Sequence, residues 1–324
     1  MIDKLELLLH LARERHFGKA AEAAGVAQPT LSSAVKSLEE QLGVIIVERG
    51  SRFRGFTPEG ERVLAWARQL SGDARAMRQE VEALRRNLCG ELRLGVVPTA
   101  LPAVTELTVP FRAHCQDVKF KVLSLTSNSI LSKLENLELD AGISYLDAEP
   151  LGRFKGVPLY EERYALLVAP DGPFEERETV TWKEAGRLPL CLLSSDMLNR
   201  RLVDQHLRDA GAEPNCTVES NSMLIIYAHV RTGGWASIIP VRLAEEFQRP
   251  GRLRAIPLVE PVVTHIIGLV LPDRDTQTPM VAKFVKLAEK VFPTSAGQPE
   301  RPESAEPAEA RLGKVPTGKR RRVQ

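Results

Sequence analysis

The chain has 324 residues, and at roughly 150 residues per domain this length predicts about two domains. Hydrophobic residues make up 43% and charged residues 27%, which excludes collagen-like, wholly disordered and small disulfide-bonded scaffolds. The 44 basic and 42 acidic residues give a formal charge of +2, so net charge alone does not indicate a nucleic-acid partner. The distribution of charge along the chain has to decide that point.

The sequence predicts a soluble cytoplasmic protein without membrane contact. Its first five residues lack the order of basic, apolar and small residues that marks a secretory signal. No apolar run approaches the roughly 18 residues of a membrane span. The cysteines are scattered without a CxxC motif, which favours reduced thiols. They are Cys89, Cys115, Cys191 and Cys216.

The first 58 residues alternate short helical patterns with tight turns. Asp3 is expected to cap a first helix, and an Ala-rich second helix is expected over 19–24. Gly25 ends that helix, because glycine tolerates the left-handed conformation. A third helix is expected over 28–42, with a proline in its first turn and Gly43 at its end.

The helix–glycine–helix unit at about 18–37 has the features of a helix-turn-helix. The exposed side of its second helix carries short polar groups and one lysine that reach base edges and phosphates. These residues are Gln28, Pro29, Thr30, Ser32, Ser33 and Lys36. A strand predicted at 44–47 and a basic turn at 49–54 would form a wing, from which Arg49, Arg52 and Arg54 would contact DNA. An Ala-rich hairpin without a DNA role is the alternative.

Residues 58–88 predict one long helix, with Thr57 as its N-cap and Pro58 at its first position. Its apolar residues alternate in steps of four and three, as in a coiled-coil seam over about 3–4 heptads. The seam consists of Val63, Ala67, Leu70, Ala74, Met77, Val81, Leu84 and Leu88. We expect dimerisation through Val63, Leu70, Met77, Val81 and Leu84. A lone amphipathic helix docked on its own domain would show a similar stripe.

Residues 90–293 alternate strand and helix patterns, which indicates an α/β architecture with mostly parallel sheets. Strands are expected at 92–97, 118–125, 141–146, 164–169, 189–193, 236–240 and 266–272, and helices at 129–137, 198–209, 223–231 and 281–291. The segment 294–324 lacks apolar periodicity and ends in KRRR, which predicts a disordered tail. Its charge of +3, from 7 basic minus 4 acidic residues, would add loose affinity for DNA or have no function.

A set of N-terminal positions carries a family resemblance. It consists of Phe17, Ala20, Ala21, Val26, Gln28, Pro29, Thr30, Leu31, Ser32, Val35, Leu38, Glu39, Leu42, Gly43, Glu48, Arg49, Thr57, Pro58, Glu59 and Gly60. This set strongly resembles the N-terminal domain of LysR-type transcriptional regulators. Further on, GELRLG (90–95), LDAGI (139–143) and TGGWASIIP (232–240) are similar to elements of that family's effector domain. The sequence departs from the family at Ala27, often a capping serine, and at Ser33, often an arginine.

The resemblance implies an α+β multidomain protein in three parts. These are a winged helix-turn-helix DNA-binding domain (1–58), a linker helix (59–89) and a two-lobed α/β effector domain (90–293) like a periplasmic binding protein. One lobe would comprise about 90–163 and 266–293, and the other about 164–265. The implied partners are double-stranded promoter DNA, a small effector, RNA polymerase and further copies of the chain, as a dimer and a tetramer of two dimers.

The resemblance also implies effector contacts. Thr99 and Ser127 match positions that often touch effector, and Ser194 and Ser195 would face them from the other lobe. Each is also explained as a helix cap or a turn residue. Hydroxyl donors and helix starts favour a small anion there, and neither Thr99 nor Ser127 is immediately flanked by Asp or Glu.

Other chemistries have little support in the sequence. The histidines show no metal-ligand spacing, and GxSxG, GxxxxGK[ST] and HExxH are absent. Ser195, Asp196 and His206 share no diagnostic arrangement, so we expect no enzyme, metal or cofactor. Two alternatives to an effector-controlled regulator remain. One is a thiol redox sensor using Cys191 and Cys216. The other is a small-molecule-binding protein without a DNA role.

Overall fold

The computed structural model describes residues 1–48, 53–85, 88–170, 174, 176–247, 253–274 and 277–293. Met1–Pro293 form one compact unit. The predicted DNA contacts Arg49 and Arg52 and the predicted tail 294–324 lie outside the described residues. Within the described ranges, no helix is both long and apolar enough to cross a membrane, and no group of three or more His, Cys, Asp or Glu side chains can hold a metal ion.

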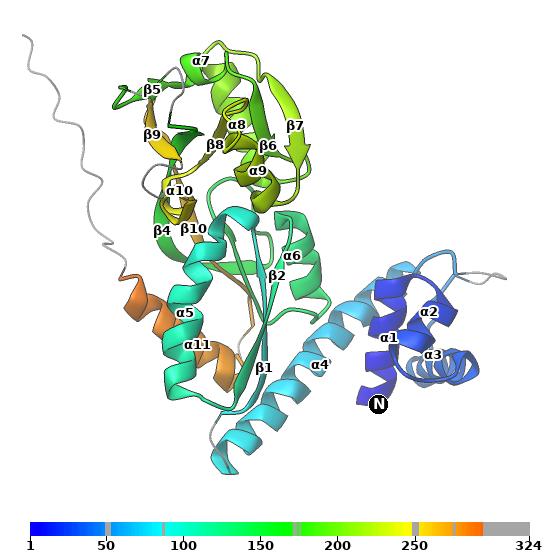
Figure 1. Cartoon of the computed structure of the whole chain (residues 1–324). Coiled ribbons are helices and arrows are strands. Elements are labelled where there is room, and N and C mark those ends of the chain that lie inside the picture. The colour runs from blue at the N-terminus through cyan, green and yellow to red at the C-terminus, as the bar shows by residue number, and fades with distance from the viewer. Residues whose placement is uncertain are drawn as a thin grey trace, which may run out of the picture. The chain divides into compact units, whose positions relative to one another are not determined.

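The N-terminal head contains α1 (Ile2–Glu14), α2 (Phe17–Ala23) and α3 (Gln28–Leu42) around a small apolar core (Figure 1). Gly25 (φ 67°) and Gly43 (φ 68°) end α2 and α3 in the left-handed conformation, as predicted. Two expectations for this region are wrong. Met1 is the N-cap of α1, so Asp3 lies inside the first turn. Among the described residues, the predicted strand at 44–47 contributes a single bridge, between Val47 and Phe56.

Helix α4 (Pro58–Arg85) is 28 residues long and follows the head directly. The Thr57 Oγ1 accepts a hydrogen bond of 2.9 Å from the Gly60 amide, which caps the helix as predicted. Leu64 and Ala67 of α4 are fully buried in the head's core. One side of α4 is therefore anchored to its own chain, and the rest of the helix extends beyond the head.

The strands that follow α4 form two sheets. The large sheet has the order β2-β1-β3-β10-β4-β9-β5, with β8 paired to β4, and β6 and β7 form a separate pair. The strands are β1 (Gly90–Val96), β2 (Val118–Ser124), β3 (Ala141–Tyr145), β4 (Phe154–Val168), β5 (Val180–Thr181), β6 (Leu190–Leu193), β7 (Cys216–Ser220), β8 (Ser237–Pro240), β9 (Arg254–Val259) and β10 (Thr264–Pro272). The expectation of mostly parallel sheets is wrong, because the long strands β4 and β10 run antiparallel to their neighbours. These two strands connect two lobes.

The helices of this domain cover both faces of the sheet. They are α5 (Leu101–His114), α6 (Ser127–Glu135), α7 (Trp182–Ala185), α8 (Leu198–Asp209), α9 (Met223–Val230), α10 (Val241–Phe247) and α11 (Pro279–Val291). In the first lobe α5 and α11 pack together on one face and α6 lies on the other (Figure 1). The first lobe's core is built around β1, β3, α5 and α11, and the second lobe has separate core clusters containing Trp182 and Ile239.

Candidate nucleic-acid interface and inter-lobe site

Helix α3 presents a polar face away from the head's core. Leu31, Val35 and Leu38 are buried on one side of the helix. The residues predicted to contact DNA lie on the other side: Gln28, Pro29, Thr30, Ser33 and Lys36 are exposed, and Ser32 is half-buried. Arg54 is also exposed. A helix with a short-chained polar face and apolar anchors behind it is what major-groove docking requires.

The start of α3 is less firmly capped than that of α2. Ala27 is the N-cap of α3 and makes no side-chain cap hydrogen bond, as the sequence departure at this position implies. His16 caps α2, because its Nδ1 accepts from the Lys19 amide at 3.2 Å. Sequence reasoning missed that histidine cap. In the first turn of α3, Pro29 has no N–H group, and the Thr30 and Leu31 amides donate to the Ala27 carbonyl at 3.0 and 3.3 Å. The Gln28 N–H is therefore the first-turn donor that an outside acceptor such as a DNA phosphate would meet.

The two lobes meet through a buried set of hydrogen bonds that we call the Tyr145 cluster: Thr99, Tyr145, Glu162 and Asn199. The Tyr145 hydroxyl donates to Glu162 Oε1 at 2.6 Å and accepts from Asn199 Nδ2 at 3.0 Å. The Thr99 Oγ1 lies 3.2 Å from the same hydroxyl. Thr99 precedes α5 in the first lobe, whereas Asn199 lies in α8 of the second. A side chain from each lobe thus meets one hydroxyl, and all four residues are at most 5% exposed.

Glu162 is the unusual member of this cluster. Its Oε2 is buried and has no hydrogen-bond partner among the described residues. Burial is the main cause that raises the pKa of Glu162 to about 8; the Tyr145 hydrogen bond lowers the pKa and the charge of Asp147 raises it, both by less. The protonated form of Glu162 therefore predominates at pH 7. A neutral carboxyl group in this position is able to donate a hydrogen bond as well as accept one.

A pair of histidines lies beside the cluster. His206 Nε2 and His265 Nε2 are 3.1 Å apart, and His265 Nδ1 lies 3.3 Å from Asp147 Oδ2. The His206 ring also packs against Tyr164 and Trp182. Burial, and then the charge of His265, lower the pKa of His206. His206 thus belongs to a packed aromatic group.

Ser127 also lies at the junction, where it holds a carboxylate of the chain itself. It is the first residue of α6, is 5% exposed, and its Oγ donates to Glu149 Oε2 at 3.0 Å. The same Glu149 forms an ion pair with Arg201 of α8 in the second lobe. No acidic residue flanks Thr99 or Ser127 in the sequence, but Glu149 and Glu162 reach the junction from distant parts of the chain. The lack of flanking acids therefore does not keep carboxylates away from this site.

The other two predicted effector residues are placed less clearly. The Ser194 Oγ is buried and has no hydrogen-bond partner among the described residues. Ser195 is exposed. Within the described part of the chain, no hydrogen bond joins either serine to Thr99 or Ser127. The structure thus brings Thr99 and Ser127 to the junction, whereas the described hydrogen bonds do not place the serine pair there.

Sequence reasoning missed the residues that build the junction. They are Tyr145, Glu149, Glu162, Asn199 and Arg201. One pattern was available for Glu162, since Tyr160, Glu162 and Tyr164 alternate as one face of a strand. The predicted strand began only at 164, ten residues after the observed start of β4, so this alternation was overlooked.

The two candidate redox cysteines lie on the neighbouring strands β6 and β7 and are free thiols. Cys191 is fully buried, and burial raises its pKa to about 11. Burial also raises the pKa of Cys216, whose Sγ donates to the Val218 carbonyl at 3.3 Å. Both environments disfavour the thiolate, which is the reactive form.

Comparison with known families matches nearly the whole described chain. Residues 2–61 match the bacterial regulatory helix-turn-helix protein model of the lysR family, and residues 85–293 match the LysR substrate binding domain. The chain therefore belongs to the LysR family of transcriptional regulators. It is a DNA-binding transcriptional regulator and not an enzyme.

Individual relatives align over almost their full length. A "Probable nitrogen assimilation transcriptional activator" of Synechococcus elongatus is 28% identical over 90% of this chain and 95% of its own. A "Probable hydrogen peroxide-inducible genes activator" of Streptomyces viridosporus is 31% identical over 83% of this chain and 87% of its own. Full-length OxyR from Pseudomonas aeruginosa has a similar structure, with a TM-score of 0.69 at 26% identity over 90% of this chain and 97% of that one.

Proposed function

We propose that this regulator reads double-stranded promoter DNA with α3 and responds to a small molecule bound between its lobes. The observation that carries the second part is the meeting of Thr99 and Asn199, one from each lobe, on the Tyr145 hydroxyl. A ligand that inserts there exchanges these buried hydrogen bonds for its own and so biases the angle between the lobes. Support for the first part comes from the exposed polar face of α3 and from a family member solved in complex with its target DNA.

We propose further that the effector carries an anionic group that displaces Glu149. In the present arrangement the Glu149 carboxylate occupies the position beside Ser127 and Arg201. An anion of the ligand satisfies the same hydroxyl and guanidinium groups, and Glu149 then swings out to solvent. The Glu149 carboxylate thus competes with the ligand's anionic group for Ser127 and Arg201, which lowers the apparent affinity for the ligand.

A thermal-shift screen of small metabolite anions, with uncharged and amine analogues as separate arms, tests this proposal. A ligand at 100 times its dissociation constant stabilises the protein by about 2.7 kcal/mol, which is readily detected. Glu149→Gln should strengthen binding of anions, whereas Thr99→Val and Ser127→Ala should weaken it. If an anion stabilises the wild type and all three variants equally, its site lies elsewhere. If only neutral or cationic compounds bind, the anionic class is wrong.

We propose that α4 pairs two copies of the chain, which places two heads on one palindromic site. Large exposed apolar side chains on α4 are Trp66, Leu70, Met77, Val81 and Leu84. At about 100° per residue these five positions fall within about 60° of the helix circumference. Three residues of the predicted seam are covered by the chain itself, since Ala67 and Ala74 are buried and Val63 packs on the head's core. The exposed apolar stripe is therefore rotated around the helix relative to the predicted seam, towards Trp66. The family resemblance further suggests that two dimers form a tetramer and that the regulator contacts RNA polymerase, and we include both in the proposal.

A second candidate function is peroxide sensing, favoured by the names of several relatives that are called hydrogen peroxide-inducible genes activators. The environments of Cys191 and Cys216 argue against it, because burial raises the pKa of both thiols. Footprinting of the full chain with and without hydrogen peroxide distinguishes the two functions. A peroxide-dependent footprint that is lost in Cys216→Ser would favour the redox sensor.

A further inference from the structure

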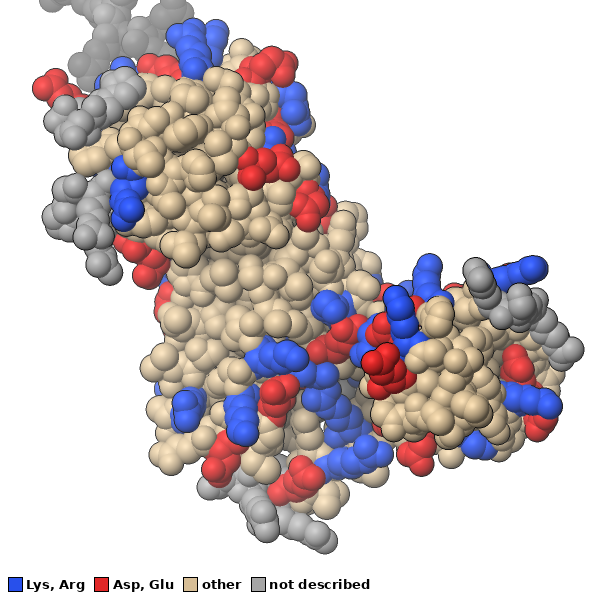
Figure 2. Space-filling view, turned by 45° about the vertical axis from the view of Figure 1, so that its right-hand side comes forward, with Lys and Arg blue, Asp and Glu red and all other residues tan. Residues whose placement is uncertain are grey.

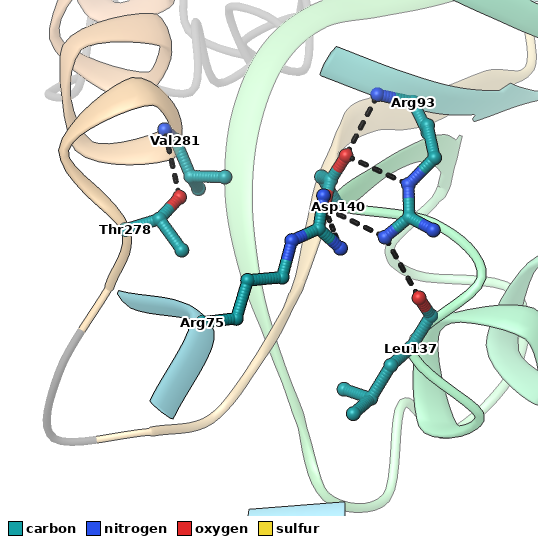
Figure 3. A network of polar contacts seen from close by, with 6 residues as sticks. All are labelled: Arg75, Arg93, Leu137, Asp140, Thr278 and Val281. Carbon is teal, nitrogen blue, oxygen red and sulfur yellow. Dashed lines mark hydrogen bonds and ion pairs between the residues drawn. The ribbon is translucent and has the colours of Figure 1, made fainter. Parts of the chain in front are cut away.

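Helix α4 is fastened to the first lobe by two ion pairs. Arg68 Nη1 lies 3.1 Å from Glu135 Oε1. Arg75 Nη1 lies 3.1 Å from Asp140 Oδ1, and Figure 3 shows this second pair. Seven residues separate the two arginines, so they project from nearly the same side of α4. Both acceptors belong to the segment 135–140, which connects α6 to β3. Figure 2 shows basic and acidic side chains interleaved in this part of the surface.

The connecting segment is itself held rigidly. The Asp140 carboxylate accepts hydrogen bonds from the Arg93 amide at 2.8 Å and from the Arg93 guanidinium at 3.0 and 3.1 Å. Arg93 also donates to the Leu137 carbonyl at 2.7 Å, and Leu137 has a φ of 60° (Figure 3). Asp140 is only 10% exposed. Arg75 therefore pairs with the Asp140 carboxylate, which is held in position by hydrogen bonds from Arg93 of β1.

Both elements that leave this segment run to the inter-lobe junction. Helix α6 spans about 14 Å from Glu135 back to Ser127, which holds Glu149 at the junction. Strand β3 spans about 13 Å from Ala141 to Tyr145, the centre of the Tyr145 cluster. One end of each element thus touches α4, and the other end touches the proposed effector site.

Helix α6 and strand β3 are packed too closely to move separately. A Cβ atom added to Gly142 of β3 would lie 2.4 Å from Ile130 Cγ2 of α6. Gly95 of β1 meets the same surface, since its added Cβ would lie 2.4 Å from Leu139 Cδ1 and 3.1 Å from Ile130. Ile130 and Leu134 are fully buried in this contact. Close-packed elements of this kind shift as one body.

We propose that α6 and β3 form one lever that couples the inter-lobe junction to α4, with Arg68–Glu135 and Arg75–Asp140 as its grip on the helix. This inference rests on the proposed function and specifies how that site acts. A change at Ser127 or Tyr145 displaces the lever, the lever displaces α4, and the heads change their spacing on DNA. Coupling of this kind is reciprocal, so DNA binding at the heads must alter the junction.

Hydrogen exchange measured by mass spectrometry tests this reciprocity without a known effector. The probe is a duplex selected from a random library by the wild-type chain. In wild type we expect the duplex to change exchange rates about fivefold in peptides covering 127–135 and 141–145, a size typical of allosteric coupling. Peptides from β9, in the second lobe, serve as the internal reference.

The decisive variant combines Arg68→Ala with Arg75→Ala, and the matched control is Arg62→Ala, an exposed arginine of the same helix. The double variant should bind the duplex within about threefold of wild type and lose the DNA-dependent change at α6 and β3. The control should retain it. If the wild type shows no change, or if the double variant keeps it in full, the lever is wrong. Failure of the wild type to select or bind any duplex would overturn the proposed function instead.

Discussion

The head and the inter-lobe junction present their polar groups differently: those of the head are exposed, and those of the junction are buried. The head places short polar side chains on the open face of a single helix, so its interface is local in sequence and exposed to solvent. The junction gathers its polar groups from η1 (Pro98–Ala100), β3, β4 and α8, and buries them almost completely. The head is suited to a large, charged and hydrated partner. The junction is suited to a small one that has to replace hydrogen bonds already made.

If α4 pairs two chains as proposed, two heads act together on one DNA site, whereas each junction lies within a single chain. Replacing Leu70 or Met77 with Asp should abolish dimers, since it places an uncompensated charge in the exposed apolar stripe of two pairing helices. We expect the dimer dissociation constant to rise at least about 100-fold, which corresponds to about 3 kcal/mol. Sedimentation or light scattering over a concentration series measures it.

Gln69→Asp is the matched control for the stripe, because it adds the same charge on the neighbouring exposed position outside the stripe. It should leave the dimer intact. A Leu70→Asp or Met77→Asp chain that stays dimeric would show that another surface carries the association, and the proposed pairing of heads through α4 would then fail.

The burial of Glu162 at the junction predicts that the stability of the protein depends on pH. Glu162 has a pKa near 4.5 when exposed and about 8 in the fold, so the folded state binds one more proton between these values. Stability should therefore be highest at low pH with respect to this group, fall as the pH rises from about 4.5 to 8, and be level above that. The slope is at most about 1.4 kcal/mol per pH unit.

Glu162→Gln isolates this effect, because glutamine resembles the neutral carboxyl group and still accepts the Tyr145 hydrogen bond. Urea unfolding between pH 5.5 and 8.5 should give wild type a steeper decline than the variant. Parallel slopes would mean that Glu162 is ionised throughout the range. Asp147 and the histidine pair beside Glu162 are present in both proteins, so the comparison reports on the side chain at position 162.

The exposed interface should respond to substitution in two separable ways. Arg54→Ala should weaken binding to all sequences alike and reduce the salt slope by about one, if Arg54 neutralises one phosphate. Gln28→Ala or Ser32→Ala should instead relax preference at particular base pairs, at a cost of about 1–3 kcal/mol. Binding titrations on the selected duplex and on single-base variants of it, at two salt concentrations, distinguish the effects. If Gln28→Ala weakened binding to all duplexes equally, Gln28 would contact the DNA phosphate backbone and not a base.

How much the sequence predicts follows from the same contrast. Helices α3 and α8 begin and end at the predicted residues, because their apolar spacing and their end signals are local. The junction was only half predicted: Thr99 and Ser127 came from the family resemblance, while their partners Tyr145 and Glu149 depend on strand order in space. Helix α5 was missed for a local reason, since Pro102 and Pro110 interrupt its pattern. The rotation of the α4 stripe towards Trp66 was also unpredictable, because tertiary contacts decide which side of a helix its own chain covers.

The smallest expected effect concerns the thiols, where we predict almost no response. A thiol with a pKa of about 11, as for Cys191, is ionised to the order of 0.03% at pH 7.5, and the thiolate is the form that attacks peroxide. Cys216 is less buried, but its pKa is raised as well, so a Cys191–Cys216 relay lacks an activated first partner. Mass spectrometry after brief, stoichiometric peroxide treatment should find both residues reduced, and the footprint of Cys216→Ser should equal that of wild type. Rapid formation of a disulfide between them would reverse this conclusion. The sensing site would then be the β6-β7 pair of the second lobe and not the junction.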